Sequence, residues 1–137
     1  MGTSRLESAH DFRIEEEHPA PGTVVFPIHG DADMRVAAAL KDRLAVAIDD
    51  EKTSALVLDL SRMTFVDSMV LGVFLGAMKR LRARGGRLRV VAPHNDIRRV
   101  FEMTLLDRVF ELDETREAAL GTVTALDQAQ RDGRAGS

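Results

Sequence analysis

One short apolar run near the middle of the chain limits the possible folds more than any other feature. Residues 55–60 read Ala-Leu-Val-Leu-Asp-Leu, so a segment of strand length is apolar at almost every position. Such a strand is typical of the centre of a sheet, where helices cover both faces. The chain is therefore predicted to be an α/β protein with residues 55–60 as a central strand.

Segments of strand-like and helix-like sequence alternate on both sides of this run. Phe12, Ile14 and Glu16 indicate a first edge strand, which residues 19–22 break. Pro27 in the next run indicates an edge or a bulge. The pattern predicts a mixed five-stranded sheet. Its strands are expected at Phe12 to Glu16, Thr23 to His29, Ala55 to Leu60, Arg87 to Ala92 and Val109 to Leu112.

Four segments carry apolar residues at helical spacing. The first follows Asp33, its expected N-cap, and the second ends at Gly85, where a C-cap needs a positive φ. The second to fourth helices are expected at residues 68–84, 96 to about 106 and 115 to about 126. The residues expected to face the core are Ala37, Leu40, Leu44, Ala47 and Ile48 in the first helix, Leu71, Phe74, Leu75 and Met78 in the second, Ile97, Val100, Phe101 and Leu105 in the third, and Ala119, Leu120 and Val123 in the last.

The length of 137 residues and the hydrophobic content of 45% suit one domain with a real core. We expect this domain at residues 12–126, between polar, flexible tails at 1–11 and 127–137. Because cysteine is absent, disulfides and thiolate chemistry are excluded and a reducing compartment is favoured. The most apolar run, Ser68 to Met78, is far shorter than the ~20 residues needed to cross a bilayer. A cytoplasmic protein without a membrane span is expected.

The residues provide no recognisable grouping for catalysis. A Walker-type Lys, a G-x-G-x-x-G loop and a credible Ser-His-Asp order are all absent. His10, His18, His29 and His94 lack metal-ligand spacing. A receiver domain, with Asp59 as phosphoacceptor, would need a Lys after its last strand, where this chain has none. We expect a binding protein and not an enzyme, with no cofactor and no metal.

A cluster of cations between Lys79 and Arg89 raises nucleic-acid binding as an alternative. Aromatic residues make up only 4% of the chain, and no stacking platform is interleaved with the cluster. Cations at the end of a helix also suit its negative C-terminal dipole. We therefore favour a solvated helix end and expect no direct contact with nucleic acid.

The turn at Asp67-Ser68 leads from the central strand into an unusually apolar helix. Met69, Val70 and Val73 make the side opposite the expected inward stripe apolar as well. A helix of this kind is either buried on both sides or completed by a partner. Either Asp67 or Ser68 can act as its N-cap.

Two glycines, Gly72 and Gly76, lie four residues apart in the same helix. Each costs about 1 kcal/mol relative to Ala in a helix. Their presence indicates that another backbone packs closely there, and tight packing of the helix on the sheet is the favoured interpretation.

The segment from Asp59 to Ser68, followed by Leu71-Gly72, resembles the signature of STAS domains, particularly of bacterial anti-sigma factor antagonists. The resemblance continues in order across roughly residues 12–126 and implies a single STAS domain. The further segments that carry it are Gly30 to Asp33, which is similar to the family's G-E-[LI]-D loop, Gly85-Gly86 with Leu88 to Val91, and Leu105-Leu106 to Phe110.

In this family the Ser after the signature Asp is phosphorylated by a kinase that is also the anti-sigma factor. The resemblance implies that Ser68 is this residue, that the unmodified protein binds the kinase and frees a sigma factor, and that a phosphatase reverses the modification. A helix N-terminus tolerates a phosphate, whereas about two added negative charges would weaken an apolar interface. The expected partner-binding residues are Asp31, Asp33, Asp67, Met69, Val70 and Val73.

Met69-Val70 stands where the family usually has a small residue and Gly. This departure supports an alternative, a non-phosphorylated STAS module that uses the Met69/Val70 surface for constitutive binding or assembly. The sequence leaves open whether the domain forms a homodimer.

Overall fold

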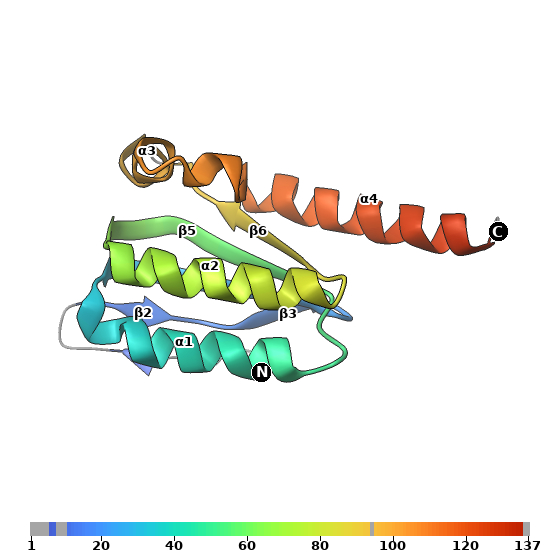
Figure 1. Cartoon of the computed structure of the whole chain (residues 1–137), viewed down its shortest axis with the longest axis horizontal. Helices are drawn as coiled ribbons and strands as arrows, with labels where there is room; N and C mark the ends of the chain where they lie inside the picture. Colours follow the sequence, from blue (N-terminus) through green and yellow to red (C-terminus); the bar gives the residue numbers. More distant parts are fainter. Residues whose placement is uncertain (1–5, 8–10, 94, 136–137) are drawn as a thin grey trace.

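A mixed sheet forms the centre of the protein, with helices on both of its faces (Figure 1). This computed structural model describes residues 6–7, 11–93 and 95–135. Within these residues the sheet has the order β1-β2-β4-β5-β6-β7, and β3 also pairs with β4. The strands β4 to β7 are parallel, whereas β1, β2 and β3 pair antiparallel. The strands are β1 (Leu6–Glu7), β2 (Arg13–Ile14), β3 (Glu17–Ala20), β4 (Thr23–Ala32), β5 (Ala55–Val66), β6 (Arg87–Val91) and β7 (Glu111–Asp113).

The predicted five-stranded sheet corresponds to five main positions, because β2 and β3 divide one position beside β4. The predicted break at residues 19–22 is wrong at its start, since β3 continues through Ala20. β1 lies inside the segment expected to be a tail. The bulge at Pro27 is confirmed by a register shift, but the edge interpretation is wrong because β4 is paired on both sides.

The four predicted helices are confirmed, although two of their boundaries differ. The third helix ends at Met103, and α4 continues past the predicted end near Leu126 into the segment expected to be a tail. Figure 1 shows α1 and α2 side by side on one face of the sheet and α4 on the other. The helices are α1 (Met34–Asp49), α2 (Ser68–Ala83), α3 (Asn95–Met103) and α4 (Arg116–Ala135), with a 3₁₀ turn η1 (Leu106–Arg108) after α3.

Alternate residues of the central strand enter two different cores, which explains its nearly continuous apolar sequence. Leu56, Leu58 and Leu60 join the main core under α1, α2 and α3. Val57 faces the other way and packs with Ala119 of α4 in a second, smaller core. The prediction of a central strand covered on both faces is confirmed.

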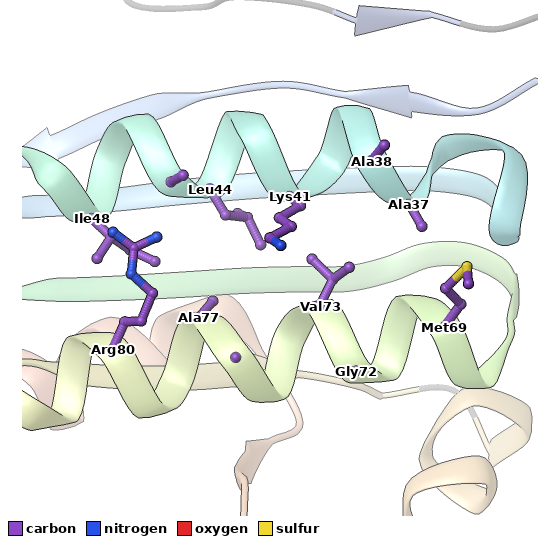
Figure 2. A pocket seen from close by; sticks show the side chains of 12 residues that line it. Ala37, Ala38, Lys41, Leu44, Ile48, Met69, Gly72, Val73, Ala77 and Arg80 are labelled. Atoms are coloured by element: carbon purple, nitrogen blue, oxygen red, sulfur yellow. The ribbon is translucent and has the colours of Figure 1, made fainter.

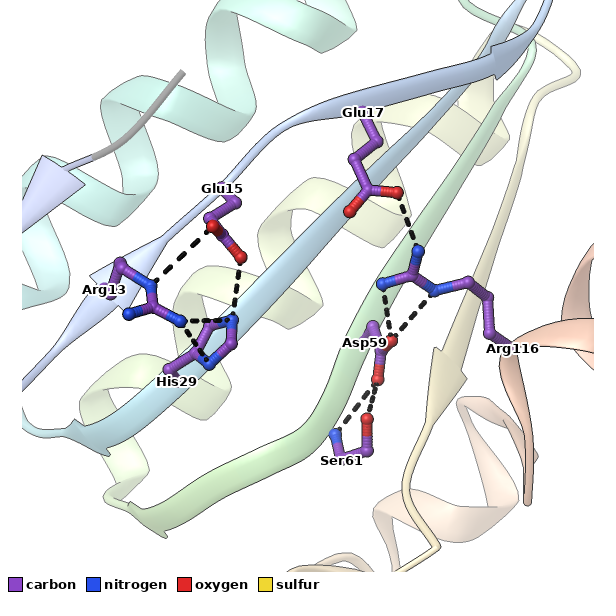
Figure 3. Close-up of polar contacts among 7 residues, drawn as sticks. All are labelled: Arg13, Glu15, Glu17, His29, Asp59, Ser61 and Arg116. Carbon is purple, nitrogen blue, oxygen red and sulfur yellow. Dashed lines mark hydrogen bonds and ion pairs between the residues drawn. The ribbon is translucent and has the colours of Figure 1, made fainter. Parts of the chain in front are cut away.

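Asp59 is the polar exception in this strand, and it anchors the helix on the α4 face. Its side chain is 8% exposed and accepts a hydrogen bond from Arg116 Nε at 3.0 Å (Figure 3). Arg116 also bonds Glu17 at 2.7 Å. Burial alone would lower the pKa of Arg116, but its bonds with Asp59 and Glu17 raise the pKa above the ordinary value. The first turn of α4 is thereby fixed to the sheet.

One predicted core residue lies outside the core. Leu105 is 56% exposed and has a φ of 61°, while Leu106 packs against the main core in its place. The third helix ends earlier than the apolar pattern predicts. Leu105 is therefore outside the helix and does not lie one turn after Phe101 on its core-facing side. Within the described residues, none of the helices combines the length and apolar character that a membrane span requires.

Candidate functional site

The turns that precede α1 and α2 lie next to each other at one edge of the sheet. Carboxyl ends of parallel strands meet at the same edge, and both β4 and β5 run further than predicted, to Ala32 and Val66. Asp31 is the register partner of Phe65. The two segments identified separately from the sequence, residues 30–33 and 67–68, therefore form one surface.

Asp67 is the N-cap of α2, which decides between the two candidates for that role. Its Oδ1 accepts a hydrogen bond from the backbone N–H of Val70 at 3.0 Å, and its backbone is extended, with φ −104° and ψ 175°. Ser68 is the first helical residue and is exposed. Within the described part of the chain its hydroxyl has no hydrogen-bond partner. The hydroxyl is accordingly free to meet a partner.

The carboxyl end of β4 needs its glycine for two reasons. Gly30 has a φ of +82°, a conformation that side chains disfavour, and a Cβ there would lie 2.3 Å from the carbonyl oxygen of Asp11. Asp33, which lies between β4 and α1, is confirmed as the N-cap of α1 by the bond from the N–H of Arg35 to Oδ1, at 2.9 Å.

The two aspartates at this junction, Asp31 and Asp33, hold neighbouring side chains. Asp31 is exposed and accepts a hydrogen bond from Thr64 Oγ1 at 2.6 Å. Asp33 accepts from Arg35 Nε at 3.1 Å, and this hydrogen bond raises the pKa of Arg35 above its ordinary value. Both carboxylates are thus held in place by neighbouring side chains. Any partner-binding role comes in addition to these contacts.

Three large apolar side chains are exposed at the start of α1, the end of β5 and the start of α2, and only the last was expected from the sequence. Met69 was expected and is 54% exposed. Met34, at the start of α1, is 65% exposed, and Phe65, at the end of β5, is 49% exposed. The exposure of Phe65 follows from strand alternation. Neighbouring residues of a strand face opposite sides, and its neighbour Val66 is buried. Exposed large apolar side chains near one edge of a domain are candidates for a protein-binding surface.

The expected exposure of Val70 is wrong. Val70 is completely buried, and Val73 is half-buried against the main core. With the helix capped at Asp67, Val70 lies one turn before Phe74 and therefore points into the same core. The surface of α2 near Ser68 consists of Met69 and part of Val73.

The expected tight packing at Gly72 and Gly76 is also wrong. A Cβ built on either glycine would have nothing within 4 Å. Both glycines line a groove between α1 and α2 with a volume of about 450 Å³, and Met69 lies at one end of it (Figure 2).

A second hollow lies on the α4 face and is polar. There His29 bonds Glu15 at 2.9 Å and Arg13 at 3.1 Å, beside the Asp59 cluster (Figure 3). Within the residues that the structure describes, no three His, Asp or Glu side chains are arranged to hold a metal ion. The charged and polar side chains of this hollow pair with one another.

Comparison with known proteins identifies the family. The STAS domain family matches residues 15–119. The anti-sigma-F factor antagonist RsfB of Mycobacterium tuberculosis is 32% identical over 99 residues, which cover 72% of this chain and 80% of that protein.

Solved structures agree with this match. An anti-sigma factor antagonist from Mycobacterium paratuberculosis has a TM-score of 0.77 at 30% identity, over 87% of this chain and 99% of that one. SpoIIAA, a Bacillus cell fate determinant, is 26% identical. Its unphosphorylated form has a TM-score of 0.72 over 82% of this chain and 96% of that one. Its phosphorylated form has a TM-score of 0.65 over 80% and 98%. From sequence and fold together, the chain belongs to the STAS domain family.

Proposed function

We propose that this protein is an anti-sigma factor antagonist, and that phosphorylation of Ser68 switches off its binding to an anti-sigma factor. The observation that carries the proposal is the exposed Ser68 hydroxyl, without a hydrogen-bond partner among the described residues, at the first position of α2. Relatives that are named anti-sigma factor antagonists support it, as does the existence of a phosphorylated form of SpoIIAA.

The position of Ser68 allows a phosphate to act without refolding the domain. The first amides of a helix have no intrahelical acceptor, and the helix dipole favours an anion there. A phosphate would bring about two negative charges next to Met69, which is exposed, and close to Asp31 and Asp67, which already carry negative charge. An apolar contact at this edge would lose affinity through desolvation and repulsion.

The chemistry of this cycle lies with the partners. A serine kinase that is also the anti-sigma factor would transfer the phosphate, and a phosphatase would remove it. The unmodified protein would occupy the anti-sigma factor in the cytoplasm and so release a sigma factor. In this cycle the chain is a regulated ligand and not an enzyme.

A second candidate function follows from the exposure of Met69. A constitutive STAS module would bind through an apolar surface and would need no modification. Since Val70 is buried, such a surface would consist of Met69 with Met34 and Phe65.

Intact mass of the protein purified from its own cells separates the two functions. The switch predicts a population heavier by one phosphate, which peptide mapping assigns to Ser68 and which is missing from Ser68→Ala. A constitutive module predicts a single unmodified mass under every growth condition.

A further inference from the structure

A shallow apolar groove runs between α1 and α2, on the face of the sheet opposite α4 (Figure 2). Its floor is formed by buried residues such as Leu44, and its α2 wall by Met69, Gly72, Val73 and Gly76. From Met69 to Arg80 the groove follows α2 for twelve residues, which corresponds to ~16 Å, or about three helical turns. The length and the walls suit a helix as occupant.

The glycines keep this groove open. Glycine is less favourable than alanine inside a helix, yet both Gly72 and Gly76 are exposed and a Cβ would meet nothing within 4 Å. The part of α1 that lines the groove also carries small residues, Ala37, Ala38 and Ala45. Nothing in the described chain needs the space that these residues leave. A backbone approaching from outside could therefore come close to α2.

The groove also carries a cation that lacks a partner among the described residues. Lys41 extends from α1 toward the space between the two helices (Figure 2), and it forms no ion pair there. Arg80, at the far end, is instead paired with Asp49. The ammonium group of Lys41, unpaired among the described residues, favours an occupant with one carboxylate facing it.

We propose that the groove receives a helix of the anti-sigma factor, with small and apolar residues facing Gly72 and Gly76 and an acidic residue facing Lys41. This inference rests on the function proposed above. It extends the same interface, since Met69 both follows Ser68 and lines the groove. A second copy of this chain fits less well, because two concave surfaces are not complementary and would bring like charges at Lys41 together.

Filling the groove tests the proposal. Gly72→Leu and Gly76→Leu place side chains into open space, so both variants fold with melting temperatures at or above that of the wild type. Calorimetric titration with the purified anti-sigma factor kinases of the source organism is expected to show affinity reduced at least tenfold. Gly121→Leu is the matched control, because Gly121 is also exposed and open but lies on α4. Its affinity is expected to equal that of the wild type.

Charge reversal provides a second measurement. Lys41→Glu is expected to weaken the same binding at least fivefold, whereas Lys79→Glu, an exposed lysine on α2 that does not line the groove, leaves it unchanged. Wild-type affinity in both leucine variants overturns the groove proposal, even when Ser68→Asp abolishes binding and so supports the switch. Loss of self-association alone in Gly76→Leu, with kinase binding intact, overturns it in favour of a second copy. If the wild type binds none of the kinases, the proposed function fails as well.

Discussion

The backbone N–H of Asp67 donates a hydrogen bond to the carbonyl oxygen of Ala32, at 3.2 Å. Because Ala32 directly precedes the cap of α1, this bond joins the starts of the two helices that form the candidate interface. The side chains of Asp33 and Asp67 each cap the helix that follows them. The side chain of Ser68 takes no part in these bonds. Mutations can therefore change the stability of this edge and the modification of Ser68 independently.

Asp67→Ala is expected to lower the free energy of unfolding by about 1 kcal/mol, because the amide of Val70 loses its capping acceptor. Urea denaturation followed by circular dichroism measures this change. Ser68→Ala is the control and is expected to change stability by less than about 0.5 kcal/mol, since its side chain is exposed. Equal losses in the two variants would mean that Ser68 shares the capping role.

Gly30→Ala is expected to be strongly destabilising, by about 2 kcal/mol or more, because the new Cβ meets the carbonyl oxygen of Asp11 at a positive φ. Gly121→Ala is the opposite case, since open space and a helical backbone predict a gain of up to about 1 kcal/mol. Thermal unfolding of the two variants measures whether the first is less stable and the second more stable than the wild type. A Gly30→Ala variant as stable as the wild type would contradict the described conformation of Gly30 and its close approach to Asp11.

Leu105→Gly is expected to stabilise the domain by about 1 kcal/mol. Leu105 has a φ of 61°, where a side chain is strained, and its exposure leaves little burial to lose. Leu106→Ala, one residue later, is expected to destabilise, because this side chain packs against the main core. If both substitutions lower the midpoint of urea unfolding, Leu105 has a packing role that its exposure conceals.

These two neighbouring leucines illustrate what the sequence could predict. The alternation of residues 55–60 between two cores, the cap at Asp33 and the positive φ of Gly85 were predictable because each depends on a local pattern. The positions of Leu105 and Leu106 depend instead on where α3 ends, which packing of the whole domain decides. Local periodicity does not contain that information.

The candidate site was predictable to a similar degree. The resemblance to the family pointed to the Asp67-Ser68 turn, and the structure brings residues 31–33 beside it. The burial of Val70 and the exposure of Phe65 depend on the cap position and on the true length of β5. The open space at Gly72 and Gly76 depends on how α1 and α2 lie relative to each other, so the sequence of α2 alone could not predict it.

Arg116→Ala is expected to lower stability by about 2 kcal/mol, because Asp59 is left nearly buried without its cation. The figure is below that for a fully buried pair, since Arg116 itself is 31% exposed. Faster hydrogen exchange in the first turns of α4 is the accompanying signature. Arg80→Ala breaks an exposed pair with Asp49 and should change stability by less than about 0.5 kcal/mol. If hydrogen exchange in α4 is unchanged, the Asp59 contact does not anchor that helix.

The central claim, that a negative charge at Ser68 disrupts binding to an anti-sigma factor, is tested most directly by comparing two substitutions at that position. Ser68→Ala and Ser68→Asp are titrated against the purified anti-sigma factor kinases of the source organism. Ser68→Ala is expected to bind with wild-type affinity, and Ser68→Asp with at least a hundredfold loss. Equal affinities for the two variants would contradict it.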